Sequence, residues 1–153
     1  METKSNDIEI VKVQVFSNYK VISMNIEDIT NEESMIFPNG EVNCMNWVLG
    51  HLLYIRNAFL ETLGEEPVWD GEQFSCYQRG ALPLERKDEL VSFEELKSYL
   101  QKSQDKLEAK LNTIENFNPE TINDIAIFCL HELYHSGQLG ILRRVLGKPG
   151  AIK

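Results

Sequence analysis

Two histidines and a glutamate near the end of the chain have a spacing that can bind a metal ion. The segment HELYHSGQLG, residues 131–140, places His131 and His135 four residues apart, with Glu132 directly after the first histidine. On an α-helix, residues four apart lie one above the other on one face, so both imidazoles can reach a single cation. The pair therefore predicts half of a metal site, and another part of the chain must supply the rest.

The same spacing occurs in the HExxH motif of zinc peptidases, which need a third protein ligand beyond that helix. The residues after His135, SGQLGILRRVLGKPGAIK, contain no His, Asp, Glu or Cys. The metzincin extension would need glycine and histidine at two positions where this chain has Gln138 and Ile141. A short motif of this kind often matches by chance. The sequence therefore disfavours a peptidase.

The third imidazole comes from an earlier segment. The chain has three histidines, and His51 falls on the apolar stripe of a helix predicted for residues 44–63. Three imidazoles from two helices would leave coordination positions open for water or substrate, which is typical of a catalytic metal. The alternative is that all three are packing residues, but burying unpaired imidazoles would cost roughly 1–3 kcal/mol each. We therefore predict a divalent metal bound by His51, His131 and His135.

Four helices are predicted to position these residues. Apolar residues recur at helical spacing over residues 8–29, before the turn signal FPNG at 37–40, and again over residues 44–63 and 92–114. A fourth helix, apolar on more than one face, follows Asn116–Glu120 and extends to Leu146. No strand pattern competes with this assignment. The sequence therefore predicts an all-α four-helix bundle in a single domain, residues 1–153.

Local signals mark several boundaries of these helices. Gly64 lies where a glycine in the left-handed conformation would end the second helix. Ser92 and Glu95 have the spacing of a capping box at the start of the third. Asn118 can cap the last helix, with Pro119 at its first position. Residues 64–91 show no periodicity. A connection of that length in a compact domain bridges two distant helix ends or covers a site.

Composition narrows the classes of partner. The chain has 24 acidic and 15 basic residues, a formal net charge of -9, and no basic cluster, which disfavours nucleic acids and anionic membranes. The three cysteines form no CxxC pair and are odd in number, so we expect neither a disulfide framework nor a thiolate zinc site. No signal peptide and no membrane-spanning apolar run is recognised. These features predict a cytoplasmic protein.

Two segments resemble a known family. NWVLGHL, residues 46–52, and HELYHSGQLGILRRVLG, residues 131–147, are similar to the two signature segments of the DinB-like (DinB/YfiT) superfamily of metal-dependent four-helix bundles. The resemblance covers nearly the whole chain in helix order and length. It implies a divalent metal on His51, His131 and His135. It also implies homodimers and, in members with known chemistry, transfer or isomerisation with low-molecular-weight thiols such as mycothiol or bacillithiol.

The functional hypothesis follows from the metal and the resemblance together. We expect a metal-dependent thiol S-transferase that acts on a small molecule in detoxification or stress response, with a non-catalytic metal-binding bundle as the alternative. Zn or Ni is the first expectation for the ion, and Fe or Mn also suits histidine ligands. Glu132 is a candidate general base, with a surface glutamate or one that supports a metal ligand as the alternatives. Gln138 orients substrate or a ligand or is a packed amide. Cys44 ranks low as a ligand or nucleophile.

Overall fold

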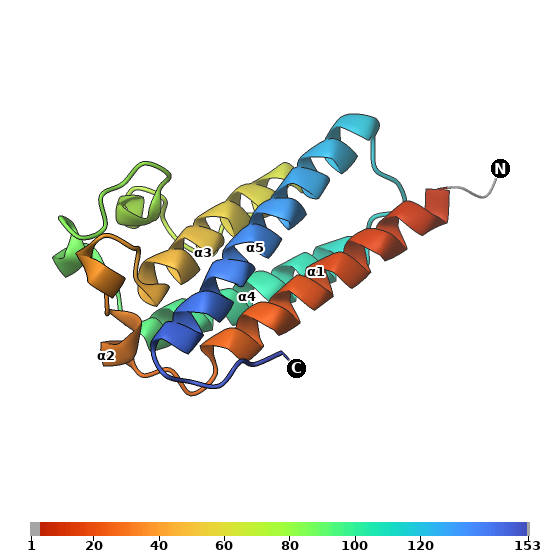
Figure 1. Ribbon diagram of the computed structural model, residues 1–153. Coiled ribbons are helices and arrows are strands. Elements are labelled where there is room, and N and C mark those ends of the chain that lie inside the picture. The colour runs from red at the N-terminus through yellow and green to blue at the C-terminus, as the bar shows by residue number, and fades with distance from the viewer. Residues whose placement is uncertain (1–3, 153) are drawn as a thin grey trace.

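The computed structural model describes residues 4–152 and consists of helices joined by turns and loops. Figure 1 shows four long helices lying side by side, α1 (Lys4–Ile26), α3 (Met45–Thr62), α4 (Phe93–Leu111) and α5 (Pro119–Val145). The connections contain one short helix, α2 (Asn31–Ser34), and 3-10 turns at Pro38–Gly40, Ser75–Tyr77 and Lys87–Glu89. No strand occurs in residues 4–152, and the all-α prediction is confirmed.

The direction of the helices explains the long connection after α3. Helices α1 and α5 run one way and α3 and α4 run the other way, so the chain must return along α3 before α4 begins (Figure 1). Three hydrogen bonds trace this return in chain order, joining Val68 to Asn57, Tyr77 to His51 and Val91 to Asn46. Residues 64–91 therefore bridge distant helix ends, as predicted, and pass directly over His51.

Two apolar clusters fill the space between the helices. The cluster near the histidines includes Leu49, Leu52, Tyr77, Phe93 and Leu139, all fully buried. The cluster at the other end is built around Phe59, Leu60, Leu107 and Cys129. Each buried aliphatic or aromatic side chain contributes roughly 1.5–3 kcal/mol relative to an exposed one, so the two clusters hold the long helices in place.

Three boundary predictions are confirmed. Ser92 Oγ accepts a hydrogen bond from the backbone N–H of Glu95 at the start of α4, 3.2 Å away. Asn118 Oδ1 accepts one from Thr121 N at the start of α5, at 2.7 Å. Gly64 has a φ of +78° just after α3, a conformation that an L-residue adopts only with strain. Each of these signals depends on a few neighbouring residues.

The predicted ends of two helices are wrong. The first helix ends at Ile26, because Asp28 has a φ of +56° and Thr30 begins the separate helix α2 with a capping box to Glu33. Ile29 is nevertheless 2% exposed, so its place in the apolar pattern comes from the core and not from a continuing helix. The third long helix ends at Leu111 and does not reach Ile114. Apolar spacing alone does not separate a helix end from a buried turn.

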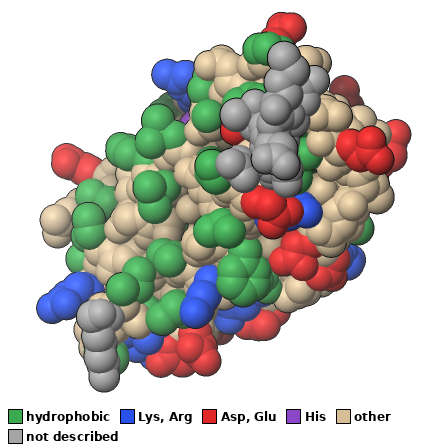
Figure 2. Space-filling model, turned by 90° about the vertical axis from the view of Figure 1, so that its right-hand side faces the viewer, with side chains coloured by type: hydrophobic (Ala, Val, Ile, Leu, Met, Phe, Trp, Pro, Cys, Tyr) green, Lys and Arg blue, Asp and Glu red, His purple; other side chains and the backbone are tan. Residues whose placement is uncertain are grey.

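Helices α1 and α5 carry large apolar side chains on their outer faces. Figure 2 shows hydrophobic side chains gathered on one half of the face and most acidic side chains on the other half. The large hydrophobic side chains that are exposed on α1 and α5 are Ile10, Val13, Phe16, Ile127, Leu130, Leu133, Tyr134, Ile141 and Val145. A homodimer remains a prediction. None of the helices in residues 4–152 is long and apolar enough to cross a bilayer.

Candidate metal centre

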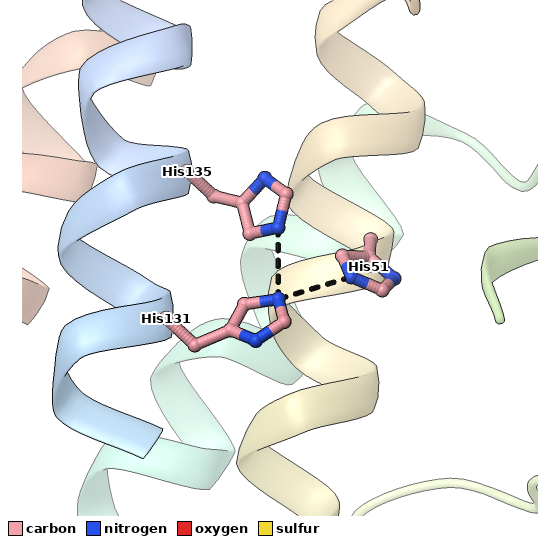
Figure 3. Close-up of side chains that lie close together, drawn as sticks. All are labelled: His51, His131 and His135. Carbon is pink, nitrogen blue, oxygen red and sulfur yellow. Dashed lines mark hydrogen bonds between the residues drawn. The ribbon is translucent and has the colours of Figure 1, made fainter. Parts of the chain in front are cut away.

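The three histidines converge from two neighbouring helices, as predicted. His51 lies on α3, and His131 and His135 lie one turn apart on α5, with their rings directed toward a common point (Figure 3). His131 Nε2 is 3.2 Å from His51 Nε2 and 2.9 Å from His135 Nε2. The nitrogen atoms that the three residues offer all lie within 4.8 Å of one another, which is close enough to hold a metal ion.

Hydrogen bonds to the outer ring nitrogens orient two of these imidazoles. His51 Nδ1 lies 2.8 Å from the carbonyl oxygen of Tyr77, and a carbonyl only accepts, so Nδ1 carries the hydrogen. His135 Nδ1 likewise donates to Gln138 Oε1 at 2.6 Å. In a neutral ring the other nitrogen then presents a lone pair. Both Nε2 atoms are therefore prepared to bind a cation at the centre of the group.

The inward nitrogens cannot all be satisfied by hydrogen bonds among themselves. His51 and His135 both present lone pairs to His131 Nε2, and a neutral His131 has one hydrogen to donate. One of the two short contacts would then place lone pair against lone pair. A shared cation removes this conflict. Four-coordinate zinc with Zn–N bonds of ~2.0–2.1 Å needs nitrogens ~3.3 Å apart. The two separations from His131 Nε2, 3.2 Å to His51 and 2.9 Å to His135, are close to this value.

Burial keeps these imidazoles in the neutral form that binds metals. His51 is 3% exposed and His135 is 8% exposed. Burial lowers the pKa of all three rings, that of His135 to about 4. The positive charge of Arg79 lowers the pKa of His131 and His51 further. The residues therefore fit a divalent ion in position, in orientation and in protonation state.

A cavity of about 730 Å³ opens beside the histidines. Helix α5, the start of α3 and the connection after α3 form its walls, with Asn43, Trp47, Arg79, Gly80, Ile127, Leu130, Tyr134 and Gln138 in the lining. Trp47 stacks on the His51 ring with centroids 4.9 Å apart. The cavity gives a small molecule access to the metal position.

Glu132 does not line the cavity, although a general base for this cavity would have to lie there. Its side chain is 1% exposed and forms an ion pair with Arg56 in the protein interior. The second carboxylate oxygen accepts a hydrogen bond from Asn18 Nδ2 at 3.2 Å, and Glu132 is absent from the cavity lining. A catalytic role for Glu132 remains a prediction, and its contacts are those of a buried ion-pair partner. It is not a solvated glutamate.

Gln138 and Cys44 occupy different surroundings. Gln138 lines the cavity and orients His135 through the hydrogen bond to its Oε1, so it contacts a proposed ligand, and a role toward substrate remains a prediction. Cys44 precedes α3 and is fully buried, and burial raises the pKa of its thiol. A buried, protonated thiol is a poor nucleophile, which agrees with its low rank as a candidate.

No family model, no curated protein and no solved structure matches the chain. The site is therefore interpreted from its own geometry.

The sequence did not predict three residues that lie at the site or beside it in the structure, namely Tyr77, Arg79 and Arg56. The signal for the first two was the long connection itself, since residues 64–91 were expected either to bridge distant helix ends or to cover a site. The pairing of Arg56 with Glu132 joins residues far apart in the chain and left no local signal.

Gly50 allows Tyr77 to approach His51. A Cβ built on Gly50 would lie 2.1 Å from Tyr77 Cδ1, and the ring is fully buried between hydrogen bonds to Asn46 and Val91. We expect Gly50→Ala to destabilise the fold by about 1–3 kcal/mol through overpacking. Displacement of the Tyr77 carbonyl should weaken metal binding by roughly 10–100-fold. Urea unfolding and metal titration measure the two effects.

Gly137→Ala is the matched control for Gly50→Ala. Gly137 also lies inside a long helix, and a Cβ there meets nothing within 4 Å. Alanine at that position should leave metal affinity unchanged and stabilise the helix by about 0.5–1 kcal/mol. Equal stability gains in both variants would contradict the role assigned to Gly50.

Proposed function

We propose that this protein is a DinB-like four-helix bundle that binds a divalent metal and transfers a low-molecular-weight thiol to a small electrophile. The convergence of three Nε2 atoms, two of them presented by hydrogen bonds at Nδ1, carries the metal part of the proposal. The two segments at residues 46–52 and 131–147 and the order of the helices support the family and the thiol. The adjoining cavity supports a small-molecule substrate.

The chain's own residues would hold the ion and the reactants. His51, His131 and His135 provide neutral ligands, so a bound divalent ion keeps its full charge and favours the thiolate form of a thiol in the cavity. Tyr77 and Gln138 fix the orientation of two of these rings. Zn or Ni is proposed first for the ion, with Fe or Mn also suited to imidazole.

The proposed reaction forms one bond and breaks one bond. The thiolate sulfur supplies an electron pair to an electrophilic carbon of the second substrate, and a carbon–sulfur bond forms. The bond from that carbon to its leaving group breaks, and the leaving group departs with the bonding pair. The thiol proton passes to solvent. The cavity positions the two reactants, which converts an encounter of two molecules into a reaction within one complex.

The test combines elemental analysis with a thiol-transfer assay. Protein purified without a nickel column is analysed for metal, and the expected result is one divalent ion per chain. The loaded protein is then incubated with bacillithiol, mycothiol or another small thiol and a chlorinated dinitrobenzene as electrophile. We expect thioether formation that needs the protein and stops with a chelator. One metal per chain without a metal-dependent rate for any thiol would favour the non-catalytic metal-binding alternative.

A further inference from the structure

The charge of the cavity lining differs in sign from that of the whole chain. The protein has a formal net charge of -9, yet its cavity lining contains Arg79 and no aspartate or glutamate. The nearby carboxylate of Glu132 is paired with Arg56 inside the bundle. A cavity with one cation and no anion attracts negatively charged ligands even on an acidic protein. A divalent ion on the histidines would add to this attraction.

The lining also presents hydrogen-bond donors that are free of protein acceptors. Within the described residues, the Arg79 guanidinium forms no ion pair, and neither it nor the amide nitrogens of Asn43 and Gln138 donate to a protein oxygen. Gln138 uses its oxygen for His135, so its nitrogen remains for a ligand. Three donor groups and no carboxylate acceptor suit a ligand rich in acceptor oxygens.

An apolar wall stands beside these donors. Ile127 and Leu130 line the cavity from α5, and both side chains are more than half exposed. The Trp47 indole also lines the cavity, from α3. Contact between apolar side chains in a cavity and the carbon atoms of a ligand removes both from water, which favours binding. The cavity therefore combines one anion-binding region with one apolar region.

We propose that the cavity selects small molecules that carry a carboxylate, which Arg79 binds, and an apolar portion, which contacts Ile127 and Leu130. A carboxylate matches one guanidinium, because its single charge and two oxygens pair with the planar N–H groups. Inorganic phosphate has no apolar portion and therefore gains nothing from Ile127 and Leu130. The inference rests on the proposed function for the thiol and adds the substrate class, with Arg79 as the specificity-determining residue.

The experiment compares a thiol acid with its ester. Binding of 3-mercaptopropionate and of its methyl ester to the metal-loaded protein is measured by calorimetry, for the wild type and for Arg79→Gln. We expect the wild type to bind the acid at least about tenfold more tightly than the ester, since a hydrogen-bonded charge is lost in the ester. Arg79→Gln should bind both alike, with the ester affinity unchanged. Inorganic phosphate should compete weakly.

Lys87→Gln is the matched control, because it removes a positive charge from the same connection outside the cavity lining. This variant should bind the acid more tightly than the ester, as the wild type does. An equal acid-to-ester ratio in Arg79→Gln and the wild type, strong competition by phosphate, or no binding of the acid would each overturn the inference. Metal content is measured in every sample. Lack of metal in the wild type would refute the proposed function instead, and the acid preference of the metal-free protein would then test Arg79 alone.

Discussion

His131→Ala is expected to lower metal affinity by more than about a hundredfold, because loss of a ligand costs more than loss of an outer hydrogen bond, which costs 10–100-fold. His131 has the central place, since its Nε2 lies next to the Nε2 atoms of both His51 and His135. A ligand that binds only the folded protein raises its stability, by about 2.7 kcal/mol at a hundredfold excess over Kd. Thermal melts with and without metal should show this gain in the wild type and not in the variant.

The metal-free melts separate a lost ligand from a damaged fold. The His131 ring nitrogen is hydrogen-bonded only to the other two histidines among the described residues, so removal of the ring breaks no hydrogen bond outside this group. Without metal, the variant should melt at or slightly above the temperature of the wild type. Asn123→Ala, an exposed change two turns earlier on α5, should keep the full metal response. A metal response of equal size in His131→Ala would refute the site.

The parts of the fold that were predictable depend on short-range signals. Ser92, Asn118 and Gly64 act on backbone groups within four residues, so each helix boundary they mark could be read without knowledge of the tertiary structure. The end of the first helix could not, because Ile29 keeps the apolar spacing after the helix has stopped. Its burial is decided by the packing of other helices against it.

The candidate site was predictable to the extent that side-chain type defines it. Histidine is scarce in the chain, and two helical stripes were enough to bring all three imidazoles together. The Tyr77 carbonyl that orients His51 is a backbone group, and any residue offers the same oxygen. Its position depends on how residues 64–91 return along α3. That path follows from the packed helices and not from a local pattern.

Glu132→Ala is expected to destabilise the protein by about 3–5 kcal/mol, because it leaves Arg56 charged and unpaired in the interior. Arg56 is fully buried, and Glu132 is 1% exposed. The carboxylate also accepts from Asn18 on α1, while the guanidinium donates to Ser103 and Gln104 on α4. The network thus joins all four long helices. Urea unfolding should show a lower midpoint at an unchanged slope.

The double variant Arg56→Met with Glu132→Leu distinguishes an unpaired charge from lost packing. Removing both charges avoids the uncompensated guanidinium, so most of the lost stability should return. Glu61→Ala, an exposed change on α3, should stay within about 0.5 kcal/mol of the wild type. Wild-type stability in Glu132→Ala would contradict the buried pair.

The folded double variant also tests the role of Glu132 in catalysis. Its three histidines and their hydrogen bonds to Tyr77 and Gln138 are unchanged, so metal binding should persist. If the ion pair is structural, thiol transfer should persist with it, because no atom of Glu132 lines the cavity. Loss of transfer in a stable, metal-loaded double variant would instead assign a chemical role to this carboxylate.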